Sequence, residues 1–539
     1  MSKAPNGIAN PIPLKEYHQA RWNEPVVMEL GAPGRRGLVF PEPEESVTEA
    51  VGPAADLVPA NMRRRTPPAL PEMTEHDTLR HYLRLSQMVQ GMMGVSLFGT
   101  CTMKYNPRVS EYLGLRPQMA ALHPYQREET LQGILEIIHS FDLILRELSG
   151  MDQFVFQAAG GADAAYTQAC VTRGYFAAKG ELEQRNEIIT TIQTHPCNPA
   201  TAATAGFKVI TLMIEENGYP SINALKAALS NRTAALMINN PDDMGVYNPN
   251  IREWVKLVKE AGALAFYDHA NFNGVMSKIR ARDLGFDACM YMLHKTFGGP
   301  KGGGGPAVGA YGCSAELAPF LPRPIVVKDD STGAYSLDHD RDMSIGKVRE
   351  FLGNVHIVMR AYAWARGMGA EGIREASDIS VLANNYMEKG LSAIRGVSKS
   401  HSHLPGHRIE MTRYSLGQMK EETGLGVVEV SNRLTDYGVD APWLSHEPWL
   451  VPEPFTPEAG ELWSKEDIDY WIAALAKVSE EAYSTPDVVR DAPHNAAIHK
   501  IDGSALEDPA RWATTWRAFK RKTTEAEQAP APKMASAGA

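Results

Sequence analysis

Apolar runs and amphipathic segments alternate along the chain between about residues 76 and 330. Residues 234–239 form one apolar run, residues 251–261 carry apolar side chains at helical spacing, and residues 264–267 form the next apolar run. Such an order of strand, helix and strand is typical of α/β proteins. It predicts a mostly parallel sheet with helices on both of its faces.

A lysine follows one of these apolar runs. Residues 288–293 read as a buried strand, and His294, Lys295 and Thr296 come next, before a glycine-dense turn at 298–305. Burial favours the neutral amine, which can form a Schiff base. Glycines have no Cβ, so the backbone there can pack against a bulky ring and a phosphate. The segment is typical of the lysine that binds pyridoxal 5′-phosphate (PLP), and a surface lysine beside a flexible linker is the alternative.

An aspartate directly follows another of the apolar runs. Asp268 follows residues 263–267 and precedes His269, Ala270 and Asn271. PLP accepts electrons while its ring nitrogen is protonated, and a carboxylate against that nitrogen keeps the proton there. Ligands of open α/β sheets collect at the carboxyl ends of the strands. We therefore expect Asp268 to bind the ring nitrogen, with a helix cap or a turn as the alternative role.

A phosphate site is expected after the strand at residues 154–156. A helix is predicted over residues 164–179, and its first turn would present free N–H groups and a positive dipole end to an anion. The turn before this helix contains Gly160, Gly161 and Ala162. The glycines could instead make only a tight turn, and Asp163 could act simply as the helix cap.

His195 follows the apolar run 188–193. An imidazole there can stack on the pyridine ring or move protons near neutral pH. A structural histidine is the alternative, but the place of His195 between the phosphate turn and the aspartate favours the cofactor site. We expect Lys295, His195 and Asp268 to be the catalytic residues, with no metal. The expected cofactor-binding residues are Lys295, Asp268, His195, Gly160, Gly161, Ala162, Asn271, His294 and Thr296.

Six motifs carry a resemblance to a known family. They are GAPGRRG (31–37), GTCTMKYNPRV (99–109), LHPYQREETLQG (122–133), HPCNPATAATAG (195–206), LHKTF (293–297) with the following GGGGP, and SIGKVREFLGN (344–354). From about residue 28 to about residue 490 the chain resembles glycine dehydrogenase (decarboxylating) subunit 2, the P-protein of the glycine cleavage system. CTMKYNP and HKTF followed by GGGGP are the most specific of these motifs.

The resemblance implies a fold and a chemistry. The fold is type I of the PLP enzymes, similar to aspartate aminotransferase, with a large domain, a smaller C-terminal α+β domain and an N-terminal arm. Lys295 becomes the Schiff-base lysine, Asp268 the partner of the pyridinium and His195 the residue stacked on the ring. The implied activity is release of CO2 from glycine, with transfer of the aminomethyl group to a lipoylated carrier protein. Subunit 1 is the implied partner, in a dimer or a heterotetramer.

The chain departs from the family pattern at several positions. It has Ala162 and Ala164 where the family usually has His and Glu, and Cys197, Asp242–Asp243 and Lys301 also differ. One alternative is therefore a PLP-dependent decarboxylase or C–C lyase that acts on a larger amino acid without a lipoyl carrier. Another is a catalytically silent assembly subunit, against which retention of the lysine and the aspartate argues. Candidates for contacts to the substrate carboxylate or the carrier arm are Lys104, Asn106, His123 and Tyr125, each of which could equally be structural.

The composition agrees with a soluble enzyme. The net charge of −10 argues against a nucleic-acid surface. No apolar run is long enough to span a bilayer, and residues 1–17 lack the apolar core of a signal peptide. The 5 cysteines are scattered without metal-like spacing, which suits a reducing cytoplasm.

Four regions are expected along the chain. Residues 1–75 are rich in proline and charge and read as an arm that wraps a neighbouring subunit, and residues 76–330 read as the large PLP-binding domain. Residues 331–522 read as the small domain, with helices around 345–395, a strand-like run at 427–430 and a late helix. The late helix opens with the capping box Ser464-x-x-Asp467 and runs to about Ala482. Residues 523–539 read as a disordered tail.

Overall fold

The structure is a computed structural model that describes residues 12–66, 68–89, 107–299, 307–446, 449–501 and 503–528. The chain forms two compact units. The larger unit is Met1–Lys15 with Val95–Arg490, and it contains the sheet expected from the sequence. The smaller unit is Glu16–Gly94 with Asp491–Ala539. The four-region division remains a prediction.

A seven-stranded sheet organises the larger unit, in the order β1-β7-β6-β5-β4-β2-β3. Its strands are β1 (Gln153–Ala158), β2 (Glu187–Thr191), β3 (Lys208–Leu212), β4 (Thr233–Asn239), β5 (Leu264–His269), β6 (Ala288–Met292) and β7 (Gly309–Cys313). Strands β3, β2, β4, β5 and β6 pair in parallel, whereas β7 is antiparallel to both β6 and β1. The predicted α/β class with a mostly parallel sheet is confirmed.

Alternate side chains of the strands enter two different cores. In β1, Phe154 and Phe156 join one core and Val155 joins the other; in β5, Tyr267 and Phe266 divide in the same way. Successive side chains of a strand point to opposite faces, so a strand buried on both faces is apolar throughout. Helices α5 (Gln132–Ser149), α9 (Ile251–Glu260) and α10 (Val355–Leu391) contribute to the first core, and α6 (Gly161–Ala178) and α7 (Cys197–Thr204) contribute to the second.

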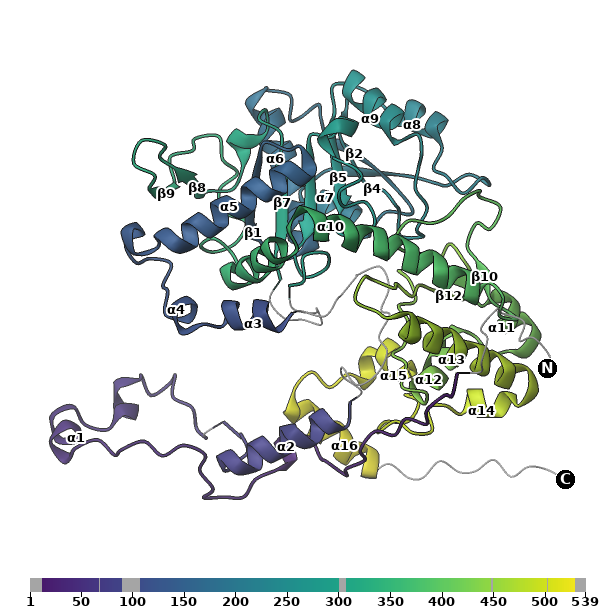
Figure 1. Cartoon of the computed structure of the whole chain (residues 1–539). Helices are drawn as coiled ribbons and strands as arrows, with labels where there is room; N and C mark the ends of the chain where they lie inside the picture. Colours follow the sequence, from purple (N-terminus) through teal and green to yellow (C-terminus); the bar gives the residue numbers. More distant parts are fainter. Residues whose placement is uncertain are drawn as a thin grey trace. The chain divides into compact units, whose positions relative to one another are not determined.

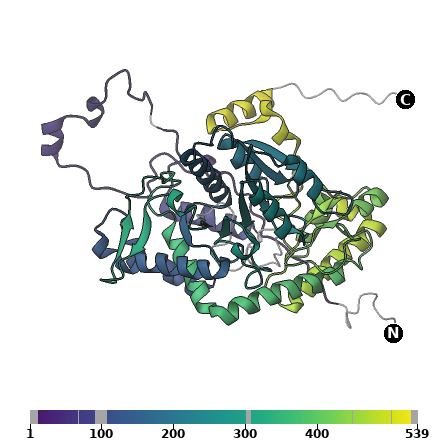
Figure 2. The same cartoon turned by 90° about the horizontal axis from the view of Figure 1, so that it is seen from above.

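Shorter elements complete this part of the chain. They are α3 (Arg108–Gly114), α4 (Pro117–Ala120), α8 (Ile222–Ala228) and the antiparallel pair β8 (Ile325–Lys328) and β9 (Tyr335–Asp338). The long helix α10 changes direction at Gly369, whose φ is 63°. It begins at residue 355, later than the predicted 345. Figure 1 shows α10, in green, running from beside the sheet toward β10, β12 and α11, and Figure 2 shows the same helix from above.

A second group of elements packs around the far end of α10. It contains β10 (Ser398–Lys399), β11 (Tyr414–Ser415), β12 (Pro454–Phe455), α11 (Gly417–Thr423), α12 (Val427–Thr435), α13 (Lys465–Ser484) and α14 (Pro486–Arg490). The three short strands form an antiparallel sheet. The predicted capping box is confirmed, because Ser464 and Asp467 exchange hydrogen bonds at the start of α13.

The strand expected at residues 427–430 is wrong, because these residues begin helix α12. The backbone N–H of Gly426 donates to Glu429 Oε2 at 3.0 Å, which caps the helix start. Val427, Val430 and Leu434 are buried, at helical spacing. The β-branched run therefore turns one apolar stripe toward a core, and tertiary packing overrides its strand propensity.

The smaller unit is mostly extended chain with short helices. These are α1 (Glu45–Val51), α2 (Glu75–Gln87), α15 (Ser504–Glu507) and α16 (Trp516–Gln528). The expected tail thus begins with helix over residues 523–528, and its remainder lies outside the described residues. Among the helices that the structure describes, none is both long and apolar enough to cross a membrane.

Candidate cofactor site

The carboxyl ends of the parallel strands meet at one edge of the sheet. Asp268 of β5 pairs with Asn239 of β4 on one side and with Met290 of β6 on the other. Ala158, the last residue of β1, and Met292, the last of β6, both pair with Gly309 of β7. The segments that follow these strands therefore gather where an open α/β sheet binds its ligands.

A cavity lies at this edge, and four of the predicted site residues line it. Its lining residues are His195, Asn239, Pro241, Asp243, Asp268, Ala270, Asn271, Lys295 and Met411. His195, Asp268, Asn271 and Lys295 come from three separate segments of the chain, after β2, at the end of β5 and after β6, and the fold brings them together. Their roles toward a cofactor remain predictions.

Asp268 is held in one orientation by hydrogen bonds. Asn198 Nδ2 donates to its Oδ2 at 2.9 Å, and the backbone N–H of Ala270 donates to its Oδ1 at 2.9 Å. The side chain is buried, and this burial raises the pKa of Asp268. The opposite effect, a lowering of the pKa of Asp268, comes from the charge of the nearby His195, the two hydrogen bonds and the charge of Lys295. A protonated ring nitrogen placed against this carboxylate would favour its ionised form.

His195 sits at the start of the segment that leads into α7. The backbone N–H of Cys197 donates to its Nδ1 at 3.1 Å, so the ring proton belongs on Nε2. Its ring lies 4.7 Å from the ring of His446, centroid to centroid, with an edge-to-face angle of 77°. Burial raises the pKa of the Cys197 thiol well above its ordinary value, so this cysteine is not activated as a thiolate.

Lys295 lies just beyond the end of β6 and is 7% exposed. Its backbone N–H donates to Met292 O at 3.1 Å in the turn that follows the strand. Burial, and next the Lys295 charge, lower the pKa of His294 to about 4, so its imidazole is neutral near pH 7. Thr296 Oγ1 accepts a hydrogen bond from the backbone N–H of Phe272 at 3.1 Å. This bond connects the turn that contains Lys295 to the segment after β5.

The predicted phosphate turn occupies the start of α6. Gly160 is the N-cap residue and no side chain caps the helix, which leaves the first-turn N–H groups to an outside acceptor. Asp163 is not the cap; its Oδ2 accepts the backbone N–H of Ala159 at 3.1 Å. A Cβ on Gly161 would lie 3.2 Å from Met292 Sδ, so the turn is close to the end of β6. The turn does not line the cavity itself.

The residues present fit PLP. The sheet edge offers a buried lysine, a buried carboxylate fixed by Asn198 and an uncapped helix start for a phosphate. Two buried polar atoms close to Lys295 and Asp268 in sequence, Asn271 Oδ1 and His294 Nδ1, have no hydrogen-bond partner among the described residues. Buried polar atoms without partners are uncommon in proteins and are consistent with a site that receives a polar ligand.

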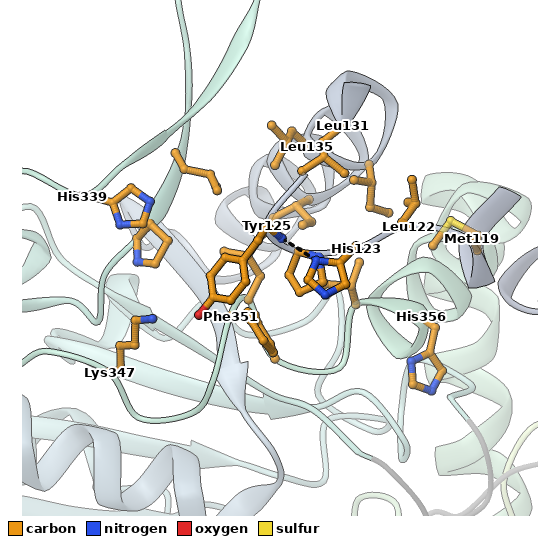
Figure 3. A pocket seen from close by; sticks show the side chains of 18 residues that line it. Met119, Leu122, His123, Tyr125, Leu131, Leu135, His339, Lys347, Phe351 and His356 are labelled. Carbon is orange, nitrogen blue, oxygen red and sulfur yellow. Dashed lines mark hydrogen bonds between the residues drawn. The ribbon is translucent and has the colours of Figure 1, made fainter. Parts of the chain in front are cut away.

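Other predicted residues lie elsewhere. His123 and Tyr125 line a larger cavity of about 390 Å³ between the starts of α5 and α10, where Figure 3 shows them near Phe351. Ala162 is exposed, whereas Ala164 is buried within α6, and neither lines the cavity beside Lys295. Lys104, Asn106 and Lys301 lie outside the described residues.

Sequence reasoning missed Asn198, which hydrogen-bonds Asp268, and several residues that line the cavity. Asn198 lies in the HPCNPA motif. Its closeness to His195 in the sequence was a signal that could have placed it in the same site. Asn239 and Asp243 flank the Asn240–Pro241 turn, and Asn239 Nδ2 donates to Asp243 Oδ1 at 3.0 Å. Met411 reaches the cavity from the C-terminal elements, and nothing local to its sequence indicates that position.

Comparisons with known proteins agree with this geometry. A family model described as glycine dehydrogenase, C-terminal domain, matches residues 376–499, and one described as aminotransferase class-V matches residues 159–316. The chain is 41% identical over 513 residues to a probable glycine dehydrogenase (decarboxylating) subunit 2 of Pyrococcus abyssi, covering 95% of this chain and 99% of that protein. It is 39% identical over 483 residues to the protein of that name from Desulforamulus reducens, covering 89% of this chain and 96% of the relative.

Solved structures share the fold. An inhibitor-bound glycine decarboxylase (P-protein) of the glycine cleavage system superposes with a TM-score of 0.68 at 20% identity, covering 82% of this chain and 99% of the other. The cysteine desulfurase CsdA of Escherichia coli superposes with a TM-score of 0.55 at 17% identity, covering 72% of this chain and 95% of the other. The chain therefore belongs to the glycine dehydrogenase (decarboxylating) subunit 2 family, whose members are fold-type-I enzymes that use pyridoxal 5′-phosphate.

Proposed function

We propose that the chain is the PLP-dependent, glycine-decarboxylating component of a glycine cleavage system. The observation that carries the proposal is the meeting of Lys295, Asp268 and His195 at one cavity on the carboxyl edge of the sheet. The choice of glycine is supported by the relatives, which are named for glycine dehydrogenase activity.

Bound PLP supplies an electron sink for the pair left on the α-carbon when CO2 departs. The task of Asp268 is to keep the proton on the ring nitrogen. Asn198 and the Ala270 N–H hold its carboxylate at 2.9 Å each, so no reorientation is needed during the reaction. The start of α6, at Gly160 and Gly161, would bind the phosphate through backbone N–H groups.

Lys295 and His195 would handle protons and orientation. The Lys295 amine would hold the cofactor, and as a buried amine that lines the cavity it would also carry a proton at the reacting carbon. His195 would pack its ring on the cofactor, since Nδ1 is fixed by the Cys197 N–H and Nε2 carries the proton.

The proposal extends to two partners. The relatives carry the name subunit 2, which supports assembly with a subunit 1. The aminomethyl group that remains after loss of CO2 needs an acceptor, and a lipoylated carrier protein is the proposed one. The new carbon–sulfur bond would form as the sulfur–sulfur bond of the carrier's disulfide breaks. The second sulfur would take up a proton and become a thiol, so the disulfide is reduced.

The test measures CO2 released from carboxyl-labelled amino acids by the full chain loaded with PLP. Release is expected from glycine when subunit 1 and a lipoylated carrier are both supplied, and release without the carrier should be much slower. Release from a larger amino acid without the carrier would favour a different decarboxylase. Bound PLP with no turnover of any amino acid would favour an assembly subunit.

A further inference from the structure

Two further aromatic rings pack in a row with His195. His446 lies in the segment between α12 and β12, and its ring is 4.7 Å from the His195 ring and 4.9 Å from the Trp443 ring, centroid to centroid. The ring planes meet at 77° and 70°, so both contacts are edge-to-face, a geometry that attracts aromatic rings beyond the area they bury. Trp443, His446 and His195 therefore form a row of three packed rings.

Only one end of this row reaches the cofactor cavity. His195 lines the cavity, whereas His446 and Trp443 do not. His446 therefore contacts His195 from outside the cavity, and the side of His195 that faces the cavity stays open to a cofactor.

The other end of the row is anchored to the segment after β12. The backbone N–H of Thr456 donates to Trp443 O at 2.8 Å, and the two residues form an isolated antiparallel bridge. Ser445 Oγ donates to the carbonyl oxygen of His446 at 3.0 Å. These bonds fix the backbone that carries both rings, so His446 can act as a rigid support.

His195 needs such a support, because a hydrogen bond fixes only one of its two ring nitrogens. Nδ1 accepts the N–H of Cys197 at 3.1 Å, and Nε2 has no hydrogen bond among the residues that the structure describes. The ring is only half buried. A ring held at one atom can still pivot about that atom, and close packing against a neighbour removes this freedom.

The surroundings of His446 favour its neutral form near pH 7. Burial lowers the pKa of His446 most, followed by the charge of His195, and Arg413 and Lys295 lower it as well, whereas Asp243 opposes them. Two imidazoles in contact repel each other when both are protonated. A neutral His446 therefore adds no repulsion when His195 takes up a proton.

We propose that His446 is a positioning residue, which packs against His195 from outside the cavity and holds that ring in the orientation that stacks on the cofactor. The proposal rests on the proposed function, because the stacking of His195 on PLP is part of it. It adds a support that does not touch the cofactor, so every effect of His446 on the cofactor should pass through His195.

The test is a double-mutant cycle of His446→Ala and His195→Ala in the full chain. Two properties are measured without substrate: the Kd of PLP, and the visible circular dichroism of bound PLP, which reports how the protein holds the ring. His446→Phe keeps an aromatic ring and removes both nitrogens. His403→Ala is the matched control, because the His403 ring makes an edge-to-face contact with His401 at 6.0 Å and 66°, and neither residue lines the cavity.

His446→Ala is expected to raise the Kd of PLP by about 3- to 10-fold, on the scale of a lost aromatic pair, and to weaken the dichroic band. His446→Phe should stay within about 2-fold of the wild type, because it keeps the edge-to-face contact. In the His195→Ala background, His446→Ala should change the Kd by no more than about 2-fold, since the ring that it supports is already gone. His403→Ala should change neither property.

Equal effects of His446→Ala with and without the His195 ring would overturn the inference, since His446 would then act by another route. A wild-type Kd and dichroic band in His446→Ala would overturn it as well. If His446→Ala does not fold, His446→Leu, which keeps the bulk of the side chain, takes its place in the cycle. If His195→Ala alone leaves both properties unchanged, the stacking role in the proposed function fails together with the inference; otherwise that role stands whatever His446 does.

Discussion

The proposed chemistry depends most on Asp268. Among the residues that line the cavity, Asp268 alone pairs with a neighbouring strand on each side and is buried at the end of its own strand. Replacing it by asparagine, Asp268→Asn, should leave PLP bound and lower turnover by on the order of 10²-fold or more, since a neutral amide no longer holds the ring proton. PLP content and the rate of CO2 release are measured on the same preparation.

The variant is expected to fold. The NH2 group of the new asparagine would face Asn198 Nδ2, which is also a donor. Asn198 Oδ1 has no partner among the described residues, so the Asn198 amide can rotate by half a turn and accept a hydrogen bond from the new NH2 group. Asn198→Ala is the matched companion, because it frees the carboxylate without neutralising it and should cost less activity. Near-normal turnover in Asp268→Asn would mean that another group serves the ring nitrogen.

Glu410 makes a pH-dependent contribution to stability. It is buried against the backbone near Gly274, and burial, followed by the charge of Glu458, raises the pKa of Glu410 to about 8. Its ordinary value is 4.5, so between pH 4.5 and about 8 the folded state binds more protons than the unfolded state. The free energy of unfolding should therefore fall as pH rises through this window.

Glu410→Gln should remove this dependence. Between pH 6 and pH 9 the wild-type chain should lose on the order of 2 kcal/mol of stability more than the variant does. Urea unfolding at both pH values measures the difference. Parallel losses in the two proteins would show that Glu410 does not carry the buried proton.

At the scale of elements, the turn after β4 and the segment before β11 must fit together closely. Gly245 has a φ of 77°, and a Cβ on it would lie 2.2 Å from Met411 O. Gly245→Ala should therefore displace the Met411 segment, reduce glycine affinity and destabilise the protein by more than the 1–2 kcal/mol that positive φ alone typically costs.

Gly180→Ala is the matched control for this prediction. Its φ is 73°, but a Cβ there would meet nothing within 4 Å. The control should lose only about 1 kcal/mol in unfolding measurements and keep its affinity for glycine. Equal effects of the two substitutions on affinity would mean that the contact with Met411 does not position the site.

The elements that were predicted well are those whose pattern is local. The apolar runs that became β4, β5 and β6 are each buried on both faces, and the polar residues after them mark the strand ends without reference to any other part of the chain. Helix α12 was missed because Val427, Val428 and Val430 favour a strand, and the helix is chosen by packing and by the Gly426–Glu429 cap. Met411 was missed because only the packing of the C-terminal elements brings it to the sheet edge.

At the scale of the whole molecule, the two compact units have their own stabilising contacts. In the smaller unit, the Glu24 side chain is 5% exposed, hydrogen-bonds with His81 Nδ1 at 2.7 Å and forms an ion pair with Arg84 at 3.1 Å. These contacts tie the extended chain before α1 to helix α2. Nothing equivalent could be predicted from the sequence, which suggested only an extended arm.

Glu24→Gln should therefore loosen the smaller unit alone. Hydrogen exchange is expected to accelerate in α2, because the charge of Glu24 that pairs with Arg84 is removed. The amides of β4, β5 and β6 should keep their protection. Faster exchange in these strands would contradict independent stabilisation of the two units, and Glu16→Gln, at an exposed position, serves as the control.

The most direct test of the central assignment is to find where the cofactor is attached. The PLP-loaded chain is reduced with borohydride, which fixes the bond between lysine and cofactor, and the modified peptide is identified by mass spectrometry. The pyridoxyl group is expected on Lys295, the buried lysine that lines the cavity with Asp268 and His195, and Lys295→Ala should carry none and release no CO2 from glycine. A pyridoxyl group on Lys104, Lys301 or any other lysine, with Lys295 unmodified, would contradict the assignment.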